Sequence, residues 1–165
     1  MDLKGAVAVV TGGNGGLGQR ICQALAREGA NIAVVCAQSL DAAHGVAREI
    51  ATRGVEAAAF ACDVTQPAQV QRLVDDVVKR FGRLDILVND AAYNKAIPFR
   101  DLDALTIEEW SKIMDVNLTG PLHCIKAVAR VPSSRPGATQ LTRTCGATAT
   151  AMQRVRWIRP AFETA

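Results

Sequence analysis

From Ala6 to Gly18 the chain reads Ala-Val-Ala-Val-Val-Thr-Gly-Gly-Asn-Gly-Gly-Leu-Gly, a short β-branched run followed at once by a glycine cluster. An apolar run of this kind is typical of a buried parallel strand. Apolar residues then recur every four positions, at Leu17, Ile21 and Leu25, which predicts a helix that ends at Gly29. The chain therefore opens with a strand, a glycine loop and a helix.

The same alternation continues to about residue 130. Further strands are predicted at Asn31–Cys36, Val55–Cys62 and Leu84–Asn89, and helices at Asp41–Thr52, Val70–Phe81 and Asn117–Arg130. Thr106-Ile-Glu-Glu109 matches a capping box, which predicts the start of another helix. Strands separated by helices imply right-handed crossovers and a parallel sheet covered on both faces. We therefore predict the α/β class, as a doubly wound, three-layer αβα sheet of the Rossmann type.

The composition excludes several other classes of protein. The 165 residues, of which 49% are hydrophobic and 21% charged, suffice for one globular domain and are not disordered throughout. No apolar run reaches the roughly 18–20 residues of a membrane span, so we expect no membrane contact and a cytoplasmic location. The five cysteines are widely spaced without a Cys-x-x-Cys pair, and His44 and His123 stand alone. Reduced thiols and no metal site are therefore expected.

The glycine cluster between the first strand and the first helix predicts a dinucleotide site. Glycines permit a tight turn and close approach to a pyrophosphate, and the helix N-terminus supplies unpaired N–H groups. Both Gly13-x-Gly15-x-x-Gly18 and Thr11-Gly12-x-x-x-Gly16-x-Gly18 fit known fingerprints. The second strand ends in Cys36-Ala37-Gln38, without the acid that would bind a ribose hydroxyl or an arginine for a 2′-phosphate. The choice between NAD and NADP stays open.

Four motifs occur in a family-specific order: Thr11-Gly-x-x-x-Gly-x-Gly18, Cys62-Asp-Val64, Leu87-Val-Asn-Asp-Ala-Ala92 and Asp115-Val-Asn-Leu-Thr-Gly120. Together they resemble the short-chain dehydrogenase/reductase family over about residues 1–130. The nearest subgroups are the 3-oxoacyl-carrier-protein reductases and the sugar or alcohol dehydrogenases. The resemblance implies an NAD(P)-dependent oxidoreductase that transfers hydride between the nicotinamide and a small carbonyl or alcohol substrate.

The resemblance also implies roles for individual residues. The pyrophosphate would lie against Gly12, Asn14, Gly16, Leu17 and Gly18, with Ala37 at the end of the second strand. Asp63 and Val64 would bind the adenine, and Asn89, Asp90 and Ala91 would pack by the adenosine ribose. Asn117 matches the catalytic asparagine that holds a proton-relaying water. Two plainer interpretations remain: Asp63 caps a turn, and Asn117 marks a helix kink.

The family's catalytic serine and its Tyr-x-x-x-Lys pair are missing from this sequence. The tyrosine normally protonates the substrate oxygen, and the lysine lowers its pKa. The only tyrosine is Tyr93, which lies too early and is followed four residues later by Ile97. We therefore expect the chain to be inactive. The alternative is a non-catalytic NAD(P)-binding or partner-binding module.

A change in composition near residue 130 divides the chain into a partial dinucleotide-binding domain, 1–130, and an atypical tail, 131–165. Residues 1–130 carry a net charge of −1, whereas the tail has five arginines, no lysine and one acid. The tail is interpreted as a frame-shifted product or as a genuine basic, disordered segment, and its scattered arginines make nucleic-acid binding unlikely. No fifth strand is expected after the order 3-2-1-4. The exposed fourth strand and last helix would then favour self-association.

Overall fold

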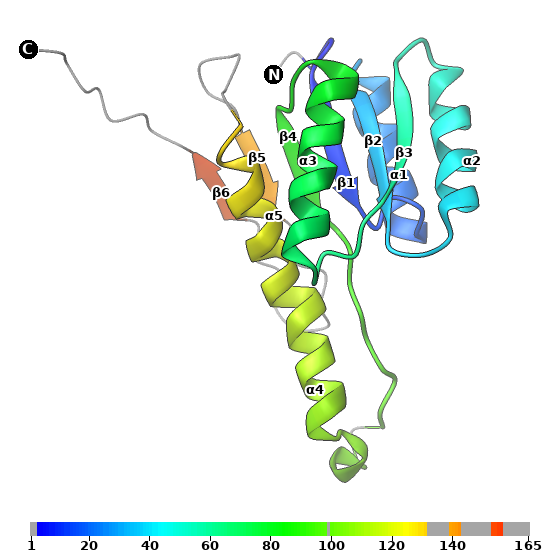
Figure 1. Ribbon diagram of the computed structural model, residues 1–165. Coiled ribbons are helices and arrows are strands. Elements are labelled where there is room, and N and C mark those ends of the chain that lie inside the picture. Colours follow the sequence, from blue (N-terminus) through cyan, green and yellow to red (C-terminus); the bar gives the residue numbers. More distant parts are fainter. Residues whose placement is uncertain (1–2, 99, 132–138, 143–152, 157–165) are drawn as a thin grey trace, which may run out of the picture.

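The structure is a computed structural model that describes residues 3–98 and 100–131, together with the backbone of 139–142 and 153–156. Its centre is a sheet in the order β3-β2-β1-β4-β5-β6 (Figure 1). The strands are β1 (Val7–Thr11), β2 (Asn31–Cys36), β3 (Ala57–Ala61), β4 (Ile86–Asn89), β5 (Thr139–Thr142) and β6 (Gln153–Arg156). The first five are parallel and β6 is antiparallel to β5. The predicted order 3-2-1-4 is confirmed.

Helices cover both faces of the sheet, as the predicted three-layer architecture requires (Figure 1). One face packs on α1 (Gly16–Arg27) and α2 (Leu40–Ala51), and the other on α3 (Pro67–Phe81) and α5 (Gly120–Val128). Residues of β1 alternate between the two cores: Ala8 and Val10 join the first, and Val7 and Val9 the second. This alternation follows from the two-residue period of a strand.

The prediction that no fifth strand follows β4 is wrong. β5 runs parallel to β4, with Val88 opposite Leu141, so β4 is not an open edge. The sequence criterion was an apolar run, and Thr139–Thr142 has only Leu141. Strand pairing, however, uses backbone N–H and C=O groups that every residue except proline supplies. The rest of the predicted tail lies outside the described residues.

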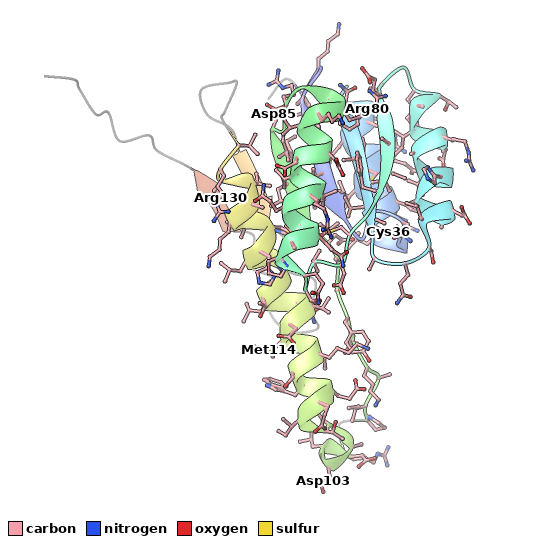
Figure 2. All side chains as sticks on the ribbon, in the orientation of Figure 1. Cys36, Arg80, Asp85, Asp103, Met114 and Arg130 are labelled. Atoms are coloured by element: carbon pink, nitrogen blue, oxygen red, sulfur yellow. The ribbon has the colours of Figure 1, made fainter. Side chains whose placement is uncertain are left out.

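The two helical stretches predicted after Thr106 are seen, and an irregular helical turn joins them. α4 (Ile107–Met114) leads into a π-helical turn, η2 (Asp115–Thr119), before α5 begins. The predicted capping box is seen at the start of α4, where Thr106 Oγ1 accepts a hydrogen bond from the Glu109 N–H. A short 3₁₀ turn, η1 (Leu102–Ala104), precedes it. Figure 2 shows the region from Asp103 in η1 to Met114 at the end of α4 extending beyond the end of the sheet. No helix among the described residues is long and apolar enough to cross a membrane.

Candidate dinucleotide-binding site

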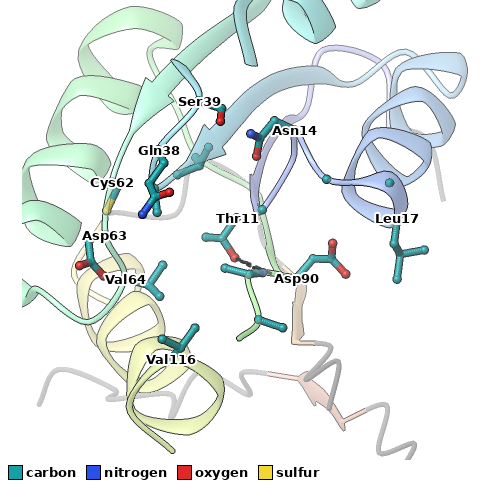
Figure 3. A pocket seen from close by; sticks show the side chains of 17 residues that line it. Thr11, Asn14, Leu17, Gln38, Ser39, Cys62, Asp63, Val64, Asp90 and Val116 are labelled. Carbon is teal, nitrogen blue, oxygen red and sulfur yellow. Dashed lines mark hydrogen bonds between the residues drawn. The ribbon is translucent and has the colours of Figure 1, made fainter. Parts of the chain in front are cut away.

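A pocket of about 480 Å³ lies beyond the carboxyl ends of β1, β2 and β3 (Figure 3). This is the position at which open α/β sheets bind ligands. Many of the residues predicted to bind the cofactor line it: Gly12, Asn14, Gly16, Leu17, Ala37, Asp63, Val64, Asp90 and Ala91. Gly18, Asn89 and Asn117 do not. Residues from four separate loops thus line a single pocket, and their binding of a cofactor stays a prediction.

Two glycines of the loop are required by its geometry. Gly12 has a φ of +69°, and a Cβ there would come within 3.0 Å of the backbone of Ala91. A Cβ on Gly18 would overlap the carbonyl oxygen of Gly12. Gly18 therefore does not face the ligand space; it allows α1 to start directly against the turn, as the third glycine of such loops does. Its predicted place beside the pyrophosphate stays a prediction, and the contact seen here is one of packing.

The loop is also tied to its neighbours by hydrogen bonds. The Gly13 N–H donates to the Val35 carbonyl at 2.9 Å, and Gln19 Nε2 donates to the Asn14 carbonyl at 2.8 Å. α1 begins after Gly15 with no side-chain cap and no acidic residue in its first turn. The N–H groups of that first turn have no partner within the helix. They form a positive, hydrogen-bond-donating end that faces the pocket at Gly16 and Leu17, suited to a phosphate.

Thr11 joins this loop to the segment after β4. Its Oγ1 accepts hydrogen bonds from the N–H groups of Asp90 and Ala91, both at 3.1 Å, and donates to the Val88 carbonyl at 3.4 Å. Thr11 belongs to the first motif, but its spacing in the sequence predicts no contact for its hydroxyl. Asn89, in contrast, was expected beside the ribose; it is 2% exposed, and its amide atoms are buried without a hydrogen-bond partner in the described structure.

Asp63 and Val64 follow β3 and form the opposite wall. Asp63 Oδ1 accepts from the N–H and hydroxyl of Thr65, at 2.9 and 2.8 Å, so the turn-capping interpretation describes a real contact. The same residue lines the pocket, which leaves the adenine role compatible with it. Val64 is held from behind by α5, because His123 Nδ1 lies 3.0 Å from its carbonyl oxygen and a Cβ on Gly120 would meet its side chain.

Asn117 lies in the π-helical turn and holds the backbone of Tyr93. Its Oδ1 accepts from the Tyr93 N–H at 2.8 Å, and its Nδ2 donates to the Tyr93 carbonyl at 2.9 Å. The structure thus places Asn117 at a helix irregularity, as its plainer interpretation supposed. Val116, its neighbour, reaches the pocket.

The charged side chains among the described pocket residues are both carboxylates, Asp63 and Asp90. Cys62 also lines the pocket, and burial, with Asp63 nearby, raises the pKa of its thiol to about 11. The thiol is therefore neutral at physiological pH and is not a nucleophile.

Two lining residues that the sequence analysis did not predict as site residues are Gln38 and Ser39, which directly follow β2. Only their position could have indicated them, because open α/β sheets bind ligands beyond the carboxyl ends of their strands, where the strand order reverses.

The comparisons with known proteins agree with this fold. A family model described as short chain dehydrogenase matches residues 6–139. An uncharacterized oxidoreductase of Methylorubrum extorquens is 39% identical over 128 residues, which make up 78% of this chain and 50% of the relative. A 3-oxoacyl-acyl-carrier-protein reductase of Staphylococcus epidermidis is 39% identical over 73% of this chain and 48% of its own length.

Solved structures give the same result. NAD⁺-bound xylitol dehydrogenase superposes with a TM-score of 0.72 at 34% identity, over 79% of this chain and 49% of that one. A short chain dehydrogenase from Burkholderia cenocepacia in complex with NADP gives a TM-score of 0.77 at 33% identity, over 86% and 56%. The chain belongs to the short-chain dehydrogenase/reductase family, as its motifs suggested. It spans about half the length of the curated relatives it matches.

Proposed function

We propose that this chain is the dinucleotide-binding part of an NAD(P)-dependent oxidoreductase acting on a carbonyl or alcohol group, close to the 3-oxoacyl-carrier-protein reductases. The observation that carries the proposal is the meeting of the glycine loop, the β2 end, Asp63-Val64 and Asp90-Ala91 around one pocket. Its relatives include a 3-oxoacyl-acyl-carrier-protein reductase and a structure solved with NADP. When bound, the nicotinamide supplies or accepts the hydride.

Each part of the pocket would hold a different part of the cofactor. The first-turn N–H groups at Gly16 and Leu17 would bind the pyrophosphate, with Gly12 and Asn14 alongside. Asp63 would accept from the adenine amine through the oxygen that does not bond Thr65, and Val64 would pack on the ring. Ala37, Asp90 and Ala91 would enclose the adenosine ribose. Gly18 and Asn89 would support the site from behind.

We also propose that these 165 residues bind the cofactor without turning over substrate. The only tyrosine, Tyr93, donates its hydroxyl to Glu109 Oε2 at 3.0 Å, so its proton is directed at a carboxylate. Asn117 would be the one remaining member of the catalytic group. The thiols of Cys22, Cys36, Cys62 and Cys124 are free and buried, which fits the cytoplasmic location expected from the sequence.

The binding proposal is tested by placing a charge where the pyrophosphate would lie. A Cβ on Gly16 meets nothing within 4 Å, so Gly16→Asp fits sterically, and an acid in the first turn favours the helix. We expect NADH binding, measured by fluorescence titration, to fall by at least about tenfold, the equivalent of about 1.4 kcal/mol. Gly45→Asp on α2, also without a neighbour within 4 Å, is the matched control. Unchanged NADH affinity in Gly16→Asp would refute this site.

A second candidate function, a partner-binding module, is favoured by one observation. Several large apolar side chains on the region from α4 to α5 are exposed: Ile107, Trp110, Leu118 and Leu122. The predicted open β4 edge no longer supports this candidate, because β5 pairs with it. The helical surface still does. The residues that line the pocket are not those of this apolar surface. Binding of a dinucleotide and binding of a protein partner can therefore be measured separately on the same preparation.

A further inference from the structure

We infer that the adenosine end of this pocket selects NAD(H) over NADP(H), through the neutral side chains of Gln38 and Ser39 and a pocket lining whose charged side chains, among the described residues, are carboxylates. The inference rests on the proposed function, since it concerns the same pocket. It assigns a specificity role to two residues directly after β2, in a sequence whose β2 end carries neither of the usual determinants.

The backbone that presents Gln38 is firmly held. The Cys36 thiol donates to the Gln38 carbonyl at 3.5 Å, and the Cys62 N–H donates to the Cys36 carbonyl at 2.8 Å. Gln38 and Ser39 both line the pocket, across from Asn14 of the glycine loop (Figure 3). In doubly wound folds the residues after the second strand meet the adenosine ribose 2′ position. Gln38 and Ser39 are therefore the side chains that would face either a 2′-hydroxyl or a 2′-phosphate.

Both side chains suit a hydroxyl. The Gln38 amide offers two donors and an acceptor, and the Ser39 hydroxyl offers one donor and acceptor sites. Although Ser39 is the N-cap of α2, its side chain makes no capping hydrogen bond, so the hydroxyl is not committed to the helix. A ribose 2′-hydroxyl can both donate and accept, and it pairs with such groups without any charge to neutralise.

The surrounding charge disfavours a phosphate. A phosphate monoester carries about −1.5 to −2 charges at pH 7 and is usually held by arginine or lysine. Among the described residues that line this pocket, the charged ones are Asp63 and Asp90, and none is a lysine or an arginine. The α2 N-terminus would attract an anion, but Asp41 in its first turn offsets that attraction. A 2′-phosphate would thus meet repulsion from these carboxylates, and no lysine or arginine among the described lining residues would neutralise it.

The test compares ADP-ribose with ADP-ribose 2′-phosphate by isothermal titration calorimetry on the full 165-residue chain. These probes report the adenosine end alone and need no catalysis. We expect ADP-ribose to bind at least about tenfold more tightly at low ionic strength. Gln38→Arg should remove most of that difference by tightening the phosphorylated probe. Gln23→Arg on α1, where Gln23 bonds Glu49 away from the pocket, adds the same charge and should leave the ratio unchanged.

The outcomes separate the inference from the proposed function. Tighter binding of ADP-ribose, with a ratio that responds to Gln38→Arg and not to Gln23→Arg, supports the inference. Equal or tighter binding of the 2′-phosphate form by the unmodified chain overturns it and leaves the dinucleotide site standing. If a chain with native circular dichroism binds neither probe, the proposed function fails, and the inference fails with it.

Discussion

The side-chain amide of Asn117 bonds both backbone groups of Tyr93, accepting from its N–H at 2.8 Å and donating to its carbonyl at 2.9 Å. The two residues are 24 positions apart, so the pair ties the segment after β4 to the π-helical turn. A side-chain amide carries an acceptor oxygen and a donor nitrogen, so one side chain can satisfy both backbone groups. The irregular turn and the path of the chain away from β4 are therefore coupled.

Asn117→Ala should destabilise the chain by about 1–3 kcal/mol, because it leaves a partly buried donor and acceptor without partners. Chemical denaturation measures this loss, and hydrogen exchange at Tyr93 should quicken. Asn31→Ala is the control, since Asn31 Oδ1 makes a single exposed bond to the Glu56 N–H. Its cost should be clearly smaller. An equal loss of unfolding free energy in the two variants would contradict a larger stabilising contribution from the two Asn117 hydrogen bonds.

Gly18→Ala should destabilise the chain by about 1–3 kcal/mol and weaken dinucleotide binding. The added Cβ would overlap the Gly12 carbonyl, which is backbone and cannot rotate away. Gly45→Ala on α2 adds the same methyl where nothing lies within 4 Å. That control should raise stability by about 0.5–1 kcal/mol, because alanine favours a helix interior. Thermal unfolding and NADH titration of both variants provide the measurement; a neutral Gly18→Ala would contradict the close packing of the loop.

The glycine loop and the first four strands could be predicted because local pattern and tertiary position agree there. The run from Val7 to Thr11 is buried on both faces, and such strands show in sequence as continuous apolar residues. β5 could not be predicted by that route. Its pairing with β4 depends on backbone groups, which leave no apolar signature in Thr139–Thr142.

Site residues divide in a similar way. Gly12, Asp63 and Ala91 lie where the motifs placed them because each motif ends a strand at the same edge of the sheet. Thr11 accepts a hydrogen bond from the backbone of Ala91, and Asn117 accepts one from the backbone of Tyr93. These bonds join residues 80 and 24 positions apart. Spacing within a motif carries no information about such contacts. Gln38 and Ser39 were not among the predicted site residues because neither residue type marks a site, and only their position after β2 indicates one.

The Glu109 carboxylate should titrate below its ordinary range. The Tyr93 hydroxyl, followed by the Lys95 ammonium at 3.3 Å, lowers the pKa of Glu109 from its usual 4.5. Tyr93→Phe should raise that pKa, as followed by carboxyl NMR titration. Lys112→Met should raise it less, because Lys112 contributes least to the shift.

The same shift predicts a pH dependence of stability with a definite sign. A carboxylate whose pKa is lowered by folding adds stability above its unfolded pKa, and that stability is lost as the pH falls through the folded value. The extra stability of the unmodified chain over Tyr93→Phe should therefore shrink below about pH 4.5. A difference that grows on acidification would contradict the Tyr93–Glu109 hydrogen bond.

The exposed apolar surface of α4, η2 and α5 should drive self-association of the chain. Ile107 is 75% exposed, Leu118 59% and Trp110 49%, which is unusual for large apolar side chains that neighbour one another along one helical region. Sedimentation velocity over a concentration series should show a dimer that Trp110→Lys abolishes, because the substitution would bury a lysine charge at the contact. Leu40→Lys, on α2 and 39% exposed, is the matched control and should still dimerise. A chain that stays monomeric throughout the series, or a dimer indifferent to Trp110→Lys, would exclude this surface as the contact.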